Sequence, residues 1–552
     1  MRQNWWKWGD PNEIKHLSDY PKLRDMVEER WKTKLREDFF PPKKISIPPI
    51  PEKKKDLIKD IFASIHPKKI SFSDDDRLSV ALGKSYLDVI RIFNGNAFAV
   101  PDVVLKPTSH EEIQTILTKA SESNVHLIPF GGGTNVVGAL TISETNSKPT
   151  AICTIDLRNY KRSISIDEEH LTATFEAGIL GPELEKILNN KGYTLGHFPQ
   201  SFEYSTLGGW IVTRSAGQES TYYGKIEDIV ERIKVATPSG TLESNPFSHD
   251  ASGINILSLF VGSEGTLGVV TEITVKIKKL PKNYRWVIAL FPTFRNGNNY
   301  LKALAQSGVK PSVVRLSDAN ETNLFSKMSS SEEQEPNLFN NLKKEAQKFI
   351  LQWKNLTEPC VCILRFPQGD FSVSSQLILA KDLVSKHDGM VAPNTIGDKW
   401  ADSRFKLPYL RDTLVEHSIY IDTMETLVHW KDTMKLHQAL NRELSKSVAF
   451  NKQKGIFLAH ISHIYPNAAC MYFTLITPMQ KGREIEQWQE IKNIVTNTII
   501  NNNGSVSHHH SVGADHQRWY KLFSDNLALE VLVSIKNKLD PKGIMNPGKL
   551  FS

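Results

Sequence analysis

The hydrophobic pattern divides most of the chain into a region where strands and helices alternate and a second region of mixed α+β character. From about Ala97 to Lys279, short apolar runs typical of strands alternate with segments of helical periodicity. The predicted strands are AFAVPDVVLKP, VHLIPF, TAICTIDL, LTATFEAGI and IVERIKVATP, and the predicted helices are SHEEIQTILTKASESN and GPELEKILNNKG. Ser109 and Glu112 form a capping box for the first helix, and Gly192 closes the second.

From about residue 281 to 500 the pattern predicts an α+β domain. Strands such as WVIALFP and CVCILRF accompany helices such as EEQEPNLFNNLKKEAQKFILQW and LVHWKDTMKLHQALNRELS.

The first 94 residues have the character of an extension. Residues 11 to 39 show helical periodicity with many charges, and PPKKISIPPIPEKKK is a proline and lysine linker in which we expect no regular structure. Trp5, Trp6 and Trp8 could touch a membrane interface, but packing on the following domain is favoured.

Composition narrows the class of protein. A chain of 552 residues predicts two or more domains, and no apolar run reaches the roughly 18 residues of a membrane span. The net charge of +7 is mild and no basic stripe stands out, which argues against nucleic acid as a partner. Cys153, Cys360, Cys362 and Cys470 form no metal-ligand or disulfide framework, which favours a reducing compartment.

One stretch, VHLIPFGGGTNVVGAL from Val125 to Leu140, indicates a close approach of backbone to a ligand. Successive glycine amides can form an anion-binding nest, and Thr134 and Asn135 add side-chain donors. An ordinary mobile turn explains three glycines equally well. The spacing fits neither the Rossmann fingerprint nor the P-loop.

Three further loops rich in glycine or hydroxyl residues follow within the same region. They are GHFPQSFEYSTLGGWIVTRSAG, YYGKIED and VGSEGTLGVVTEITVKI. Four such loops within about 150 residues exceed what loop chemistry alone usually supplies, which favours a ligand.

Together with the final DPKGIMNPGKL, the segments PFGGGTN, STLGGWIVTRSAG and SEGTLGVVTEITVKI resemble the FAD-binding domain of the vanillyl-alcohol oxidase and p-cresol methylhydroxylase superfamily. The resemblance implies an α+β fold with a two-subdomain FAD-binding domain at 95–280, an α+β cap at 281–500 and a segment at 501–552 that returns to the flavin. It also implies that the FAD site consists of Pro129, Phe130, Gly131, Gly132, Gly133, Thr134, Asn135, Gln200, Ser201, Phe202, Glu203, Tyr204, Ser205, Thr206, Thr213, Arg214, Ser215, Ala216, Glu264, Gly265, Thr266, Leu267, Gly268, Val269 and Val270. No histidine directly abuts the glycine loop, His126 being three residues before Pro129, so we expect non-covalent FAD.

Within and beyond the cap, the chain resembles the family of alkyldihydroxyacetonephosphate synthases. The matching segments are SVVRLSD, YLRDTL, YPNAACMYF and GSVSHHHSVG. The resemblance implies ether-lipid synthesis, in which the acyl chain of acyl-dihydroxyacetone phosphate is exchanged for a long-chain fatty alcohol through a flavin N5 adduct without net redox change. It also implies a homodimer, peripheral membrane contact and a peroxisomal location, although no address is evident at either end. A bacterial homologue would be cytoplasmic.

The same resemblance implies a role for each matching side chain. Tyr472 would be the acid/base, its phenol made more acidic by nearby cations. Arg411 would bind the departing carboxylate and Arg315 would support charge on the flavin. The catalytic histidines, which would bind the substrate phosphate or assist proton transfer, are His508, His509 and His510. We expect no metal, since consecutive residues on a strand point to alternate faces and cannot easily share one ion.

Two departures and two alternatives stay open. His460 and His463 stand where an arginine and a glutamine are expected in animal synthases, so the wall of the active site could differ there. The first alternative is an FAD-dependent oxidase or dehydrogenase of 2-hydroxy acids on the same fold, which would usually carry a GHxGDGN-like segment near AHISHIYPNA. The second is a flavin-binding scaffold without turnover.

Overall fold

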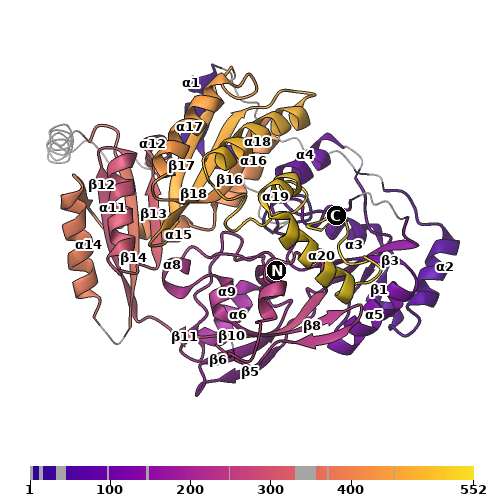
Figure 1. Ribbon diagram of the computed structural model, residues 1–552. Coiled ribbons are helices and arrows are strands. Elements are labelled where there is room, and N and C mark those ends of the chain that lie inside the picture. The colour runs from indigo at the N-terminus through magenta and orange to yellow at the C-terminus, as the bar shows by residue number, and fades with distance from the viewer. Residues whose placement is uncertain are drawn as a thin grey trace.

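The computed structural model describes residues 4–10, 16–32, 45, 47–95, 98–143, 148–247, 249–329, 356–369, 372–452 and 454–551. These residues form two lobes (Figure 1). The first lobe is built on a four-stranded and a five-stranded sheet, and the second on a seven-stranded sheet. This is the α+β fold that the resemblance implied.

The four-stranded sheet carries the glycine loop. Its order is β1-β2-β4-β3, with β2, β3 and β4 parallel and β1 antiparallel to β2. The strands are β1 (Ile70–Ser71), β2 (Val103–Leu105), β3 (Val125–Phe130) and β4 (Ala151–Asp156), accompanied by α2 (Glu52–Ile61), η2 (Pro67–Lys69), α3 (Asp74–Ser79) and α5 (His110–Glu122). Strand β3 coincides with the predicted VHLIPF, and Ser109 caps α5 by accepting a hydrogen bond from the Glu112 amide.

The five-stranded sheet is antiparallel, with the order β5-β6-β10-β8-β9. Its strands are β5 (Ser163–Asp167), β6 (Thr172–Glu176), β8 (Val230–Thr237), β9 (Gly240–Glu243) and β10 (Val269–Lys276). Around it lie α6 (Gly181–Asn189), α7 (Leu207–Val212), α8 (Ser220–Tyr223), α9 (Ile226–Ile229), α10 (Leu257–Phe260) and the small pair β7 (Tyr193–Thr194) and β11 (Lys278–Lys279). A single apolar core joins this sheet to its helices.

The seven-stranded sheet of the second lobe is antiparallel, with the order β15-β12-β14-β13-β17-β18-β16. Its strands are β12 (Asn283–Phe291), β13 (Val313–Ser317), β14 (Cys360–Gln368), β15 (Met390–Ala392), β16 (Ile419–His429), β17 (Ile456–Ile464) and β18 (Ala468–Pro478). Its helices are α11 (Phe294–Gln306), α12 (Ala319–Ser329), α14 (Ser374–Lys386), α15 (Thr395–Ser403), α16 (Leu407–Glu416), α17 (Thr433–Lys446) and α18 (Glu484–Asn501). The predicted helix EEQEPNLFNNLKKEAQKFILQW lies outside the described residues. The residues LVH of LVHW, predicted to open a helix, instead end strand β16, and Trp430 follows in a turn.

The amino-terminal part of the chain packs against both lobes. Helices α1 (Pro21–Trp31) and α4 (Tyr86–Asn94) and the turn η1 (Leu17–Asp19) contribute to the core of the second lobe, whereas α2 contributes to the first. Helix α2 begins at Glu52, so the expectation of no regular structure is wrong for the last four residues of the proline and lysine stretch. Burial of Ile58 and Phe62 against the first lobe stabilises this helix.

The carboxy-terminal part crosses back to the first lobe after α19 (Gln517–Phe523) and α20 (Asn526–Leu539), which Figure 1 draws in yellow. Leu127 of β3 donates its amide to Ile544 and accepts from the Asn546 amide. No helix in the described ranges combines the length and the hydropathy that crossing a bilayer requires.

Candidate active site

Strand β3 delivers the three glycines into a large cavity. A Cβ on Gly132 would lie 1.9 Å from the Tyr204 carbonyl oxygen, and Gly133 has a φ of +68°. Both positions therefore require glycine. Within the described part of the chain, the amides from Gly131 to Thr134 donate no hydrogen bond to protein, which leaves them free to bind an anion.

The other predicted cofactor segments meet this loop around the same cavity. Those that line it besides residues 129–135 are Gln200, Ser201, Ser205, Thr206, Thr213, Ser215, Ala216, Glu264, Gly265, Gly268, Val269 and Val270. Phe202 instead stacks on Phe405 in the core, with ring centroids 5.5 Å apart. The Arg214 side chain is 61% exposed and pairs with Glu227 at 3.1 Å, so the structure does not bring it into the cavity.

The carboxy-terminal motif closes this end of the site. The Asn546 side-chain amide donates to the carbonyls of Ala139 and Glu264, at 3.1 and 2.7 Å. Its buried Oδ1 has no hydrogen-bond partner in the described part of the chain, and Asn546 lines the cavity. A free amide nest together with an orphaned buried acceptor fits a ligand that carries both phosphate and donor groups, as FAD does.

The second lobe supplies the opposite wall through a stack centred on Tyr472 of β18. Its ring lies parallel to His460 of β17 at 4.9 Å and to His509 at 6.0 Å, while His510 meets it edge-on at 5.5 Å. His509 and His510 follow Tyr472 by more than 35 residues in the sequence, and the structure brings both rings beside it.

Arg315 of β13 approaches this stack through a buried carboxylate. Glu321 accepts from Arg315 Nη2 at 3.0 Å and from His460 Nδ1 at 2.9 Å. Although burial opposes it, the neighbouring Arg315 and His460 lower the pKa of Glu321 to about 2. The charge of Arg315 is therefore balanced and its position fixed by a second-lobe helix, α12.

The expectation that nearby cations lower the pKa of Tyr472 is wrong. Burial raises the pKa of the Tyr472 phenol, and the contrary effects of a Thr423 hydrogen bond and of Arg315 are smaller. Desolvation penalises the phenolate more than one guanidinium, already paired with Glu321, can compensate. Tyr472 is thus a neutral phenol in the resting protein.

His508, His509 and His510 lie in a bend rather than on a strand, so the premise of alternating faces is wrong. The buried Glu425 carboxylate holds this bend by accepting hydrogen bonds from the backbone amides of all three histidines, at 2.6, 3.1 and 3.0 Å. Burial lowers the pKa of each imidazole, so the three rings are neutral near pH 7. Of the three, His509 and His510 line the cavity.

Arg411 of α16 lines the cavity next to the glycine loop. Its Nε donates to the Asp412 carboxylate at 2.8 Å, and Nη1 donates to the Lys84 carbonyl. A guanidinium has five N–H donors, so further donors are left for an anionic ligand.

Several residues of the site escaped sequence reasoning. Glu321 and Glu425 organise the second-lobe wall. Trp8 is 3% exposed, lines the cavity and packs in one buried cluster with Tyr204 and Tyr409. The available signal for Glu425 was a carboxylate, one of two with Asp422, inside the otherwise apolar strand pattern IYIDTMETLVH. Trp8 packs on the protein, as was favoured over a membrane contact.

Comparison with known proteins defines the class. The FAD binding domain family matches residues 101–244, and the family of FAD linked oxidases, C-terminal domain, matches residues 280–550. A solved structure of p-cresol methylhydroxylase with bound substrate superposes with a TM-score of 0.66 at 14% identity, covering 92% of this chain and 98% of that one. The protein is thus an FAD-linked enzyme of the p-cresol methylhydroxylase fold.

Closer relatives define the family. An alkyldihydroxyacetonephosphate synthase from Dictyostelium discoideum is 34% identical over 506 residues, which cover 91% of this chain and 81% of the relative. A solved structure of alkyldihydroxyacetonephosphate synthase covers 100% of this chain and 99% of its own, with a TM-score of 0.82 and 31% identity. The chain belongs to the alkyldihydroxyacetonephosphate synthase family.

Proposed function

We propose that this protein is an ether-lipid synthase that exchanges the acyl chain of acyl-dihydroxyacetone phosphate for a long-chain fatty alcohol, with release of fatty acid. The observation that carries the proposal is the shared cavity. The glycine loop, Arg315, Arg411 and Tyr472 all line it, so a flavin cradled by the loop would share the cavity with the side chains that the family reaction requires.

FAD, when bound, supplies an electron-poor ring system against which the ketone carbon reacts. The chain's own residues position the substrate and move protons. The neutral imidazole of His510 accepts a proton at a ring nitrogen, and the Tyr472 phenol, which keeps its proton in the resting site, donates through Oη. Neutral imidazoles suit proton transfer better than binding of phosphate by charge.

Arg411 and Arg315 serve two different anionic groups, the departing carboxylate and the flavin. The planar fork of Arg411 matches the departing carboxylate, and Arg315 would support negative charge on the bound flavin. Since Glu321 and Asp412 already bind these guanidiniums, each arginine is oriented before substrate enters.

We further infer that FAD is held without a covalent bond, since the glycine loop has no adjacent histidine. Acid precipitation of the yellow protein should then leave the flavin in the supernatant. Flavin retained in the washed precipitate would contradict this inference.

The reaction is tested by anaerobic incubation with acyl-dihydroxyacetone phosphate and labelled hexadecanol. Release of fatty acid together with a labelled ether product, without an electron acceptor, supports the proposal. Bleaching of the flavin by lactate or glycolate with no ether product would instead establish a 2-hydroxy-acid dehydrogenase. A flavoprotein inert in both assays would be a scaffold.

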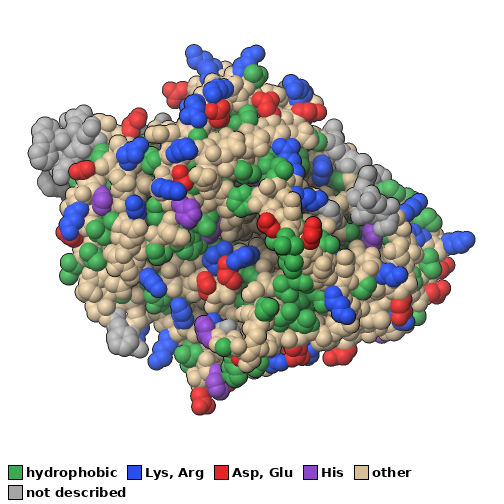
Figure 2. Space-filling model, viewed as in Figure 1, with side chains coloured by type: hydrophobic (Ala, Val, Ile, Leu, Met, Phe, Trp, Pro, Cys, Tyr) green, Lys and Arg blue, Asp and Glu red, His purple; other side chains and the backbone are tan. Residues whose placement is uncertain are grey.

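A peripheral membrane contact follows from the apolar substrates and from one surface. Hydrophobic side chains gather where Figure 1 draws α20, beside a recess near the centre of Figure 2. Leu522, Phe523, Leu527 and Val531 are 52–81% exposed there. Sedimentation with phospholipid vesicles should fall when Leu527→Asp and Val531→Asp are combined, and unchanged sedimentation would remove this surface from the proposal.

A further inference from the structure

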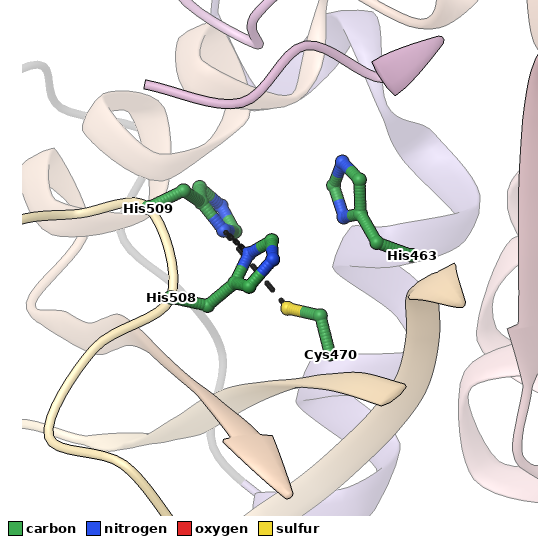
Figure 3. A group of neighbouring side chains, drawn as sticks. All are labelled: His463, Cys470, His508 and His509. Atoms are coloured by element: carbon green, nitrogen blue, oxygen red, sulfur yellow. Dashed lines mark hydrogen bonds between the residues drawn. The ribbon is translucent and has the colours of Figure 1, made fainter. Parts of the chain in front are cut away.

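A group of metal-ligating side chains lies beside Tyr472, and two of its members, His463 and His509, line the same cavity as Tyr472. It comprises His463 of β17, Cys470 of β18 and the bend residues His508 and His509 (Figure 3). Each offers one nitrogen or sulfur atom, and these four atoms lie within 4.8 Å of one another. His463, Cys470 and His508 are buried.

A β-bulge aims His463 at this group. Ile461 pairs with Met471, but His463 pairs with Cys470, so Ser462 is an extra residue in β17. In an unbroken ladder His463 would share the face of Ile461, away from Tyr472. The bulge turns its side chain to the face of Cys470, a device often found next to functional sites.

The outer nitrogens of two of these histidines are held by hydrogen bonds. His463 Nε2 lies 2.8 Å from the Gly217 carbonyl, which can only accept, so Nε2 carries the proton. The lone pair of Nδ1 accepts from the Ser462 hydroxyl at 2.9 Å, a hydrogen bond that a metal ion would replace. His508 Nε2 lies 2.7 Å from the Tyr465 hydroxyl. Metal-ligating histidines are typically oriented by such a contact at the second ring nitrogen.

Two distances between the inner atoms come close to the spacing of neighbouring metal ligands. His508 Nδ1 and His509 Nδ1 are 3.0 Å apart, and Cys470 Sγ is 3.9 Å from His509 Nδ1. Tetrahedral zinc with bonds of about 2.0–2.3 Å places its ligand atoms roughly 3.3–3.8 Å apart. Small movements of the imidazoles would bring both distances into that range.

The chemistry of the four ligands selects the ion. Imidazole nitrogen and thiolate sulfur suit Zn²⁺, whereas Mg²⁺ and Ca²⁺ take oxygen ligands. Neutral imidazole and thiolate are the forms that bind metal. Cys470 would lose its thiol proton to solvent as the Zn–S bond forms.

We propose that His463, Cys470, His508 and His509 bind one Zn²⁺ ion that fixes the histidine bend beside Tyr472. Four protein ligands close the coordination shell, so the ion has a structural role and leaves His510 free for proton transfer. The expectation of no metal considered only three adjacent imidazoles on a strand. The structure recruits two of them and adds partners from two other strands.

The test uses the tag-free flavoprotein after dialysis against a chelator, titrated with Zn²⁺ and, for spectroscopy, with Co²⁺. Wild type should take up one equivalent of Zn²⁺ and gain in melting temperature. The Co²⁺ form should show strong d–d bands of a tetrahedral thiolate site, at longer wavelengths than the flavin bands. This readout does not depend on ether synthesis, so it stands whether or not the proposed reaction is found.

Two near-isosteric variants locate the site. His463→Gln and Cys470→Ser should each weaken Zn²⁺ binding at least about tenfold and abolish the cobalt bands. Cys362→Ser on β14 and the exposed His429→Gln should leave both unchanged. Less than half an equivalent bound by wild type, full affinity in both variants, or equal losses in the controls would each overturn the proposal.

Discussion

The Tyr472 hydroxyl belongs to a residue whose ring is packed between two imidazoles. His460 and His509 lie parallel to it on either side, and Arg315 reaches His460 at 3.2 Å. A phenol stacked between two rings and half-buried has little freedom to rotate, so its proton has a fixed position relative to the cavity. Its high pKa follows from the same burial and keeps the proton in place.

The first prediction concerns this proton. Tyr472→Phe preserves the stack and should therefore fold and retain FAD, but it should lower the rate of acyl-to-alkyl exchange by roughly 10²–10⁴-fold, the range for loss of a general acid–base. Stopped assays with labelled alcohol and the flavin spectrum measure the two properties.

Tyr420→Phe is the matched control for that variant. Tyr420 is a buried tyrosine of the neighbouring strand β16, and its hydroxyl has no hydrogen-bond partner in the described part of the chain. The Tyr420→Phe variant should catalyse acyl-to-alkyl exchange at the wild-type rate. Loss of flavin from Tyr472→Phe would make Tyr472 a structural residue.

Residue types and local motifs identified some of the second-lobe side chains that line the cavity, but not the carboxylates that hold them. The sequence indicated Arg315, Tyr472 and the histidines because short segments carry them. It did not show which groups Glu321 and Glu425 would bind, because their hydrogen-bond partners His460 and residues 508–510 lie far away in the sequence. The phenol pKa was missed for the same reason, since desolvation depends on the whole surrounding fold.

At the scale of elements, the run from β3 into the glycines was the most predictable feature. A continuous apolar run that ends directly in glycines predicts a buried parallel strand followed at once by a loop. The bend at 508–510 was not predictable, because its shape is set by three hydrogen bonds to Glu425 rather than by local propensity. The bulge at Ser462 likewise depends on pairing with β18.

The glycine loop supports a second prediction. Gly132→Ala places a methyl group on the Tyr204 carbonyl, so the loop must move and the purified protein should lose most of its FAD. Absorbance at the flavin maximum relative to protein measures occupancy. Gly369→Ala, where a Cβ meets nothing within 4 Å, should retain full occupancy. Equal occupancy in both variants would show that the loop does not hold the cofactor.

At the scale of the whole molecule, the amino-terminal segment joins the two lobes. Trp8 packs edge-on against Tyr204 of the first lobe at 5.9 Å and contacts Tyr409 of the second. Lys7 pairs with the buried Glu416 at 2.6 Å, and Lys84 donates to the carbonyls of Asn4 and Trp5. Sequence periodicity cannot show such contacts, because they join residues separated by up to 409 positions.

A third prediction follows from this junction. Trp8→Ala removes a buried side chain from the contact between the lobes and should lower the free energy of unfolding by about 3–5 kcal/mol, with weaker FAD retention. Chemical denaturation followed by tryptophan and flavin fluorescence measures both. Leu57→Ala on α2, 46% exposed, is the control and should change little. Two separate unfolding transitions in Trp8→Ala would show directly that the segment couples the lobes.

The last prediction concerns the pH dependence of stability. Glu185 of α6 is buried and accepts hydrogen bonds from Thr194, Leu195 and Gly196, without a cationic partner in the described part of the chain. Burial raises its pKa to about 7, and Glu219 adds to the rise. Below the unfolded pKa of about 4.5 the carboxyl is protonated in both states and costs nothing. As the pH rises from about 4.5 to 7, the unfolded chain ionises more readily than the folded one, and stability is lost.

Glu185→Gln should therefore be close to wild type in stability at pH 5 and more stable by roughly 1–3 kcal/mol at pH 8. The amide keeps an acceptor for the two backbone N–H groups, and the Thr194 hydroxyl can turn to accept from the new NH₂ group. Melting curves across that range measure the difference. Glu183→Gln, on the same helix but with its side chain 37% exposed, should show no such divergence. A variant less stable than wild type at pH 8 would mean that the ionised carboxylate is itself stabilising, and that its three hydrogen bonds outweigh the desolvation.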